Sequence, residues 1–182
     1  MNIRFVFIFV ISFLSSHTLI AQNKSIIETI ILTGQEYPYK NVITKNIYFD
    51  VATLKPVIEF MTDSINKETR YYYHYKGKKR EVTSNISYKN GDETFEEYKN
   101  RIYWNKYSGD EMNASCLYVI LFDKRFKIKD IRIIARNGYN NLNFNFDKLV
   151  KEVLKSSEGK WEIIKSESKS DWYFAMGRFK IG

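Results

Sequence analysis

Few side chains in this 182-residue chain are of the types that perform catalysis. Cys116 is the only cysteine, and it begins the apolar run Cys116–Phe122. His74 is the only histidine beyond residue 21, and no carboxylate or nucleophile stands near it at a recognised spacing. A nucleophilic thiol needs an accessible setting that lowers its pKa, whereas apolar neighbours raise it. The sequence therefore predicts no catalytic residues, and a hydrolase that uses Cys116 or His74 is the weakest alternative.

Metal and cofactor sites find equally little support in the residue pattern. With one cysteine and one such histidine, a metal site would have to rely on carboxylates. Pairs of acidic residues are better interpreted as helix starts and solvated turns; they are Asp92-Glu93, Glu96-Glu97 and Asp110-Glu111. The eight glycines are scattered and form no phosphate-binding loop. We expect no metal and no cofactor.

A run of basic and aromatic residues, Tyr71–Arg80, has a composition that can bind other molecules. Aromatic rings beside cations can stack on single-stranded nucleic acid, on sugars or against lipid headgroups. The favoured interpretation is a hairpin whose alternate tyrosines pack on a small core, because tyrosine is common in strands. An exported protein would not meet nucleic acid, so we expect none as a partner.

The first 21 residues are typical of a secretory signal peptide. Arg4 precedes an apolar run from Phe5 to Leu14, and small and polar residues lead to Ala21. Cleavage after Ala21 would give a periplasmic or secreted protein. The alternative is an uncleaved inner-membrane anchor, but spanning takes about 20 apolar residues and this run is interrupted by Ser12 and by residues 15–18.

The formal net charge of +8 affects which partners an exported protein would meet. A basic surface attracts anionic lipids or acidic polymers of the cell envelope. The simpler alternative is that the charge only keeps the protein soluble. A single cysteine excludes an internal disulfide bond despite an oxidising compartment.

The residue pattern in the C-terminal part of the chain predicts a hairpin followed by a helix. The apolar run Cys116–Phe122 ends in the polar turn 123–125, and charged and apolar residues then nearly alternate through Ile133. A polar connection from Arg136 to Asn141 follows. The next apolar residues fall on one helical face; they are Phe146, Leu149, Val150, Val153 and Leu154.

This predicted helix should end near residues 156–159, with Gly159 as its C-terminal cap. Residues 161–164 return to an extended pattern, and Trp172–Ile181 should form the last strand. Residues 22–93 contain short runs rich in tyrosine and isoleucine, one of them from Val82 to Tyr88, which favours short antiparallel strands. The predicted fold is α+β: a β-rich N-terminal segment, then an antiparallel three-stranded sheet with a packed helix.

Residues 94–182 resemble the C-terminal domain of TonB-family energy transducers. Tyr118–Asp123 followed by Lys127–Ile133 is similar to that family's hairpin, and Phe146-Asp147-Lys148 with Gly159-Lys160-Trp161 is similar to its helix and following tryptophan. Phe95–Ile102 resembles the short helix before the hairpin. The resulting division is a signal peptide at 1–21, a β-rich segment at 22–93 and the TonB-like domain at 94–182.

The resemblance implies a binding mode for that domain. The family captures an extended segment of an outer-membrane transporter beside its last strand, which is strand addition. The matching edge residues here are Trp172, Tyr173, Phe174, Ala175, Met176 and Arg178. An envelope or outer-membrane protein is then the expected partner. Three alternatives stay open: these aromatics only complete the core, the module has lost energy coupling, or the chain is an anchored transducer.

Overall fold

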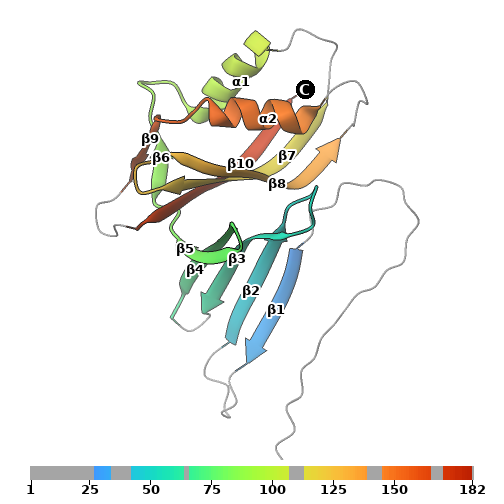
Figure 1. Cartoon of the computed structure of the whole chain (residues 1–182), viewed down its shortest axis with the longest axis vertical. Coiled ribbons are helices and arrows are strands. Elements are labelled where there is room, and N and C mark those ends of the chain that lie inside the picture. The colour runs from blue at the N-terminus through green and yellow to red at the C-terminus, as the bar shows by residue number, and fades with distance from the viewer. Residues whose placement is uncertain are drawn as a thin grey trace, which may run out of the picture.

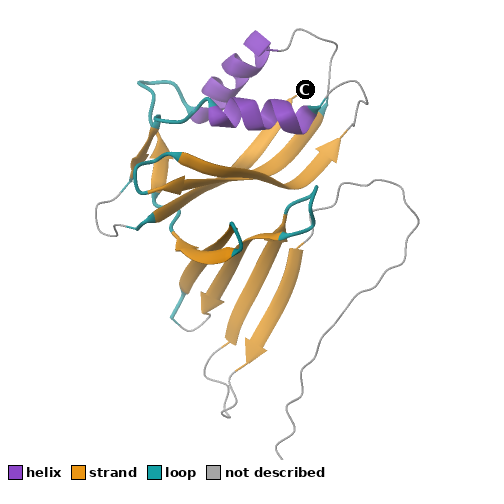
Figure 2. Ribbon diagram, in the orientation of Figure 1, coloured by secondary structure: helices purple, strands orange, loops and turns teal. Residues whose placement is uncertain are grey.

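The computed structural model describes residues 27–33, 42–63, 66–106, 113–138, 145–164 and 170–181. These residues form three layers, with two helices on one face of a three-stranded sheet and a five-stranded sheet on its other side (Figure 2). The α+β class is thereby confirmed, and the strand pairings within the three sheets are antiparallel. The predicted signal peptide lies outside the described residues. Among the described residues, no helix has the length and apolar character needed to cross a membrane.

The five-stranded sheet, here called the N-terminal sheet, is an antiparallel meander in the order β1-β2-β3-β4-β5 (Figure 1). Its strands are β1 Ile27–Thr33, β2 Val42–Phe49, β3 Pro56–Asp63, β4 Glu68–Tyr75 and β5 Lys78–Val82. Lys76 and Gly77, with φ of 50° and 71°, form the two-residue loop between β4 and β5. Positive φ at both positions matches the twist of a tight hairpin.

The three-stranded sheet, here called the central sheet, has the order β10-β7-β8. Its strands are β7 Ala114–Asp123, β8 Ile128–Gly138 and β10 Trp172–Ile181. The predicted hairpin and last strand are thus present. The expected polar connection from Arg136 is wrong at its start, because Arg136 and Asn137 continue β8 and pair with Cys116 and Ser115. Their ladder bonds outweigh the polar composition.

The helices are α1 Phe95–Lys106 and α2 Phe146–Lys155. Thr94 and Glu97 start α1 through a reciprocal pair of hydrogen bonds: Glu97 N–H donates to Thr94 Oγ1 at 3.2 Å and Thr94 N–H donates to Glu97 Oε2 at 2.7 Å. Asn145 Oδ1 accepts from Lys148 N–H at the start of α2. Gly159 is not the C-cap: Ser156 holds that position, and Gly159, with φ of 85°, belongs to the turn that follows.

A short two-stranded sheet joins the two parts of the chain. Its strands are β6 Ile86–Tyr88 and β9 Trp161–Ile163. The composition of the apolar run Val82–Tyr88 suggests a single strand, but the structure divides this run between β5 and β6. Residues 83–85 carry the chain from the N-terminal sheet to β6, and only β5 and β6 on either side are extended in ladders.

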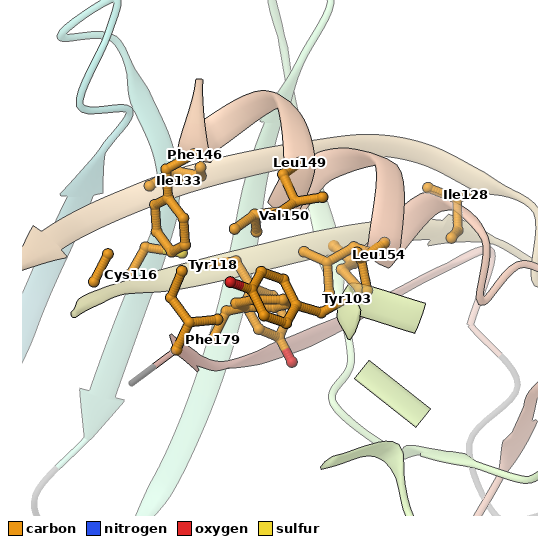
Figure 3. Close-up of a cluster of buried hydrophobic side chains, with 14 of the residues drawn as sticks. Tyr103, Cys116, Tyr118, Ile128, Ile133, Phe146, Leu149, Val150, Leu154 and Phe179 are labelled. Atoms are coloured by element: carbon orange, nitrogen blue, oxygen red, sulfur yellow. The ribbon is translucent and has the colours of Figure 1, made fainter. Parts of the chain in front are cut away.

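Two apolar cores separate the layers. The first lies between the helices and the central sheet, where the α2 stripe points toward Tyr118, Ile133 and Phe179 (Figure 3). The predicted apolar face of this helix is confirmed, since its five residues are the buried residues of α2: Phe146, Leu149, Val150, Val153 and Leu154. The second core lies between the two larger sheets and includes Ile58, Tyr73 and Phe174. The central sheet is consequently buried on both faces, which explains the almost unbroken apolar sequence of β7.

Candidate functional site

Strand β10 lies at one edge of the central sheet, with β7 as its only neighbour in the sheet order. Successive strand residues direct their backbone N–H and C=O groups to opposite sides. Thr83 N–H donates to Trp172 C=O at 3.2 Å, and Phe174 N–H donates to Thr83 C=O at 2.9 Å. The even-numbered residues of β10 thus direct their backbone groups away from β7, toward the outer edge.

The chain itself covers part of this outer edge. Thr83 meets it at Trp172 and Phe174 through an isolated parallel bridge. Farther along, Lys99 Nζ of α1 donates to Arg178 C=O at 2.7 Å. Between them, within the described residues, no hydrogen bond is recorded for the outward N–H and C=O of Met176. Met176 is therefore the edge position for which the described residues provide no backbone partner, although β6 also lies close to β10.

Lys99 is a buried cation at this edge. Its side chain is only 3% exposed, and Nζ lies 5.3, 5.5 and 5.6 Å from the ring centroids of Phe95, Tyr118 and Phe179. Glu96 Oε2, on the solvent side, is 2.8 Å from the same ammonium. Three ring faces, a carboxylate and a carbonyl compensate the desolvation of the charge. By occupying the Arg178 C=O, Lys99 also covers the outer edge of β10 at that position.

The six residues predicted for partner binding divide between the faces of β10. Tyr173 and Phe174 are buried in the two cores, with 2% and 3% exposure. Ala175 and Met176 are partly buried on opposite faces. Trp172 packs against Tyr75, with their ring centroids 5.9 Å apart. Of the six, only the Arg178 side chain is exposed. The large aromatic side chains complete the cores, so recognition at this edge would have to use the backbone.

The basic and aromatic run 71–80 comprises the later part of β4, the tight loop and the start of β5. Its alternate tyrosines pack inward: Tyr73 is fully buried, and Tyr71 and Tyr75 pack against the same core. Tyr73 Oη donates to Asp130 Oδ2 at 3.3 Å. The Arg80 guanidinium lies 4.4 Å from the Trp172 ring centroid. The predicted packing of alternate tyrosines is confirmed.

Sequence reasoning missed a charged cluster on the outer face of the N-terminal sheet. Glu59, with a side chain 5% exposed, is contacted by His74 Nε2 at 2.6 Å, Lys79 Nζ at 2.6 Å and Lys45 Nζ at 3.2 Å. Burial by itself raises the pKa of Glu59, but the hydrogen bonds from Lys79, His74 and Lys45 outweigh it and lower this pKa to about 2. Register between β2, β3, β4 and β5 creates the cluster, and local spacing carries no signal for it.

The two candidate catalytic residues are not brought together. Cys116 is 2% exposed in the core below the helices, whereas His74 binds Glu59 on the outer face of the N-terminal sheet. Burial raises the pKa of the Cys116 thiol to about 12, and the nearby charge of Asp147 acts in the same direction. In the described part of the chain, no three His, Cys, Asp or Glu side chains gather as metal ligands.

Comparisons with known proteins do not indicate a function for this chain, so a functional proposal has to rest on its sequence and its structure. No protein-family model, no curated protein and no solved structure matches this chain. The resemblance to the TonB C-terminal domain stays a prediction. The β10 edge is the feature of the structure on which that prediction can be tested.

Proposed function

We propose that this protein is an exported, non-enzymatic protein of the cell envelope that binds an extended segment of a partner protein by strand addition to β10. The observation that carries the proposal is the bridge between Thr83 and β10. It is a single backbone bridge on the outer side of β10 made within the chain itself, and at the next outward position, Met176, the described residues provide no backbone partner. An envelope or outer-membrane protein is the proposed partner.

Backbone groups would supply the affinity in this binding mode. An incoming strand would meet the N–H and C=O of Met176 first and the N–H of Arg178 next. At Arg178 C=O, a backbone N–H of the partner can replace the Lys99 ammonium. The exposed Arg178 side chain then lies beside the added strand and can contribute selectivity.

The decisive substitution is Met176→Pro, with Met176→Leu as its matched control. Proline removes the outward N–H of Met176 and leaves the ladder with β7 intact, which is why proline is tolerated on strand edges. A photo-crosslinking residue in place of Arg178 would report on the partner in intact cells. We expect a discrete cross-linked protein with the parent and the leucine variant, and its loss with the proline variant. An undiminished cross-link in the proline variant would contradict strand addition here.

A second candidate function, membrane-anchored energy transduction, differs in what happens to residues 1–21. The intact mass of the native protein from fractionated cells separates the two. A mass lacking residues 1–21 in the periplasmic fraction supports the exported binding protein. The full-length mass in the inner membrane supports the anchored transducer, for which an outer-membrane transporter would be the partner.

A further inference from the structure

A groove of about 920 Å³ lies at the opposite edge of the central sheet from β10, between α2 and the edge strand β8. Its floor on the strand side includes Ile128 and Ile131. Its helix wall includes Lys148, Lys151 and Lys155. These lysines are spaced by three and four residues and so share one flank of α2, beside the buried stripe. Their Cα positions differ by about 4.5 and 6 Å along the axis.

The carboxylates near the groove are largely compensated. Asp147 forms an ion pair with Arg136. Asp130 accepts two hydrogen bonds from Arg132 Nε, at 2.9 and 3.0 Å. Glu152 also lines the groove and has interactions of its own. Two of the three groove carboxylates are therefore engaged by arginines.

The lysines of the groove are compensated unequally. Lys155 Nζ is 2.5 Å from Glu158 Oε2, and Lys129 Nζ is 2.8 Å from Asp123 Oδ2. Within the described residues, no ion pair is recorded for Lys148 or Lys151. These two cations give the helix wall, which also carries Glu152, an excess of positive charge beside Ile128 and Ile131 on the strand side.

The backbone edge of β8 is already occupied along the groove. Ile128 N–H donates to Glu158 Oε2 at 3.0 Å, and Ile128 C=O accepts from Lys155 Nζ at 3.2 Å. Ile131 N–H donates to Asp130 Oδ1 at 3.0 Å. Side chains thus block strand addition here, in contrast to the position of Met176 on β10. A ligand of this groove would have to be recognised through its side chains.

We infer that this groove binds an extended acidic peptide segment of a partner protein, in which acidic and aliphatic residues alternate. Alternate residues of an extended peptide are about 6.6 Å apart on one face, and the long side chains of Lys148 and Lys151, whose Cα positions differ by about 4.5 Å along the axis, can reach two of them. The acidic side chains face Lys148 and Lys151, and the aliphatic ones lie against Ile128 and Ile131. A helix of ten residues is about 15 Å long and matches four or five extended residues.

The test uses a fluorescent ten-residue peptide that alternates aspartate with valine, and a twin in which asparagine replaces aspartate. Fluorescence anisotropy measures binding to the full chain at low ionic strength, where the Debye length is about 30 Å. The site variant is Lys148→Gln with Lys151→Gln. The matched control is Lys55→Gln with Lys78→Gln, which removes the same charge from exposed lysines in the N-terminal part of the fold.

We expect the acidic peptide to bind, the asparagine twin to bind much more weakly, and the site variant to lose roughly threefold to tenfold in affinity. The control variant and Met176→Pro should retain the parent affinity, which separates this site from the β10 edge. Equal losses in the site and control variants, or equal binding of the twin, would overturn the inference. So would sedimentation with anionic phospholipid vesicles that depends on Lys148 and Lys151 while the peptide does not bind.

Discussion

The ammonium of Lys99 donates a 2.7 Å hydrogen bond to the backbone C=O of Arg178, 79 residues farther along the chain. This bond attaches α1 to the outer edge of β10. It satisfies a carbonyl at the edge and gives a buried charge one of its few polar partners. A single side chain, that of Lys99, therefore covers the outer edge of β10 at Arg178, on the strand on which the proposed function depends.

Substitution Lys99→Met should loosen β10 while keeping the apolar packing of the side chain. We expect a loss of about 1.5–3 kcal/mol in the free energy of unfolding, since one hydrogen bond to a charged group disappears. Amide exchange at Gly177 and Phe179, which pair with β7, should become faster. Glu96→Gln is the control, because it leaves the bond to Arg178 in place. Unchanged exchange in the methionine variant would show that Lys99 does not restrain the edge.

Acid should weaken the cluster around Glu59. Its pKa is lowered from 4.5 to about 2 in the folded protein, so its contribution to stability is complete above pH 4.5 and is lost as the pH falls toward 2. That contribution is at most roughly 3 kcal/mol. Glu59→Gln should therefore destabilise the protein at pH 7, and the difference from the parent should shrink between pH 4.5 and 2. Urea unfolding across this range measures it.

The exposed Glu81 on β5 provides the control for this experiment. Glu81→Gln removes one carboxylate from the same sheet without touching the cluster. Its effect on unfolding should stay small at each pH. If the two variants behave alike, the cations around Glu59 do not stabilise the fold.

The thiol of Cys116 should resist alkylation in the native protein. It is 2% exposed, and burial raises its pKa to about 12, so little thiolate is available and access requires local opening. Reaction with iodoacetamide at pH 8 should be about a hundredfold slower than in the unfolded chain. Mass spectrometry follows the adduct with time. Rapid native labelling would instead revive a hydrolase that uses this thiol.

Gly177 has no room for a side chain. A Cβ at this position would lie 2.7 Å from Tyr118 Oη and 3.0 Å from its Cζ. Gly177→Ala should therefore cost about 1–3 kcal/mol, because Tyr118 is buried against the helices and cannot move freely. Adding Tyr118→Phe removes the closer clash and should restore part of the loss. Additive effects in the double variant would mean that the two residues do not clash.

Periodic patterns in the sequence predicted the elements that are built from local signals. The stripe Phe146–Leu154 became α2, and the last strand begins and ends at the predicted residues, Trp172 and Ile181. Errors arose where ladder bonds override composition. Arg136 and Asn137 look like loop residues but extend β8, and Val82–Tyr88 looks like one strand but is divided between two sheets.

The candidate sites depend on contacts that sequence spacing does not encode. Glu59 lies in an apolar run, and its partners come from three other strands once their register is set. Likewise, the side-chain protection of β8 and the lack of a backbone partner for Met176 among the described residues follow from which residues happen to reach each edge. No local pattern could have distinguished the two edges of the central sheet.

By itself, the amino-acid sequence determined that this is an α+β protein with a helix packed on an antiparallel sheet. The reason is that the spacing of apolar residues within each segment distinguishes a helix from a strand and marks its buried face. Tertiary structure alone decided that the central sheet is buried on both faces, and that Tyr173 and Phe174 complete the cores. It also decided that Thr83 and Lys99 cover the β10 edge on either side of Met176. The physical reason is that pairing and burial between distant segments depend on how whole layers stack, which short-range spacing cannot specify.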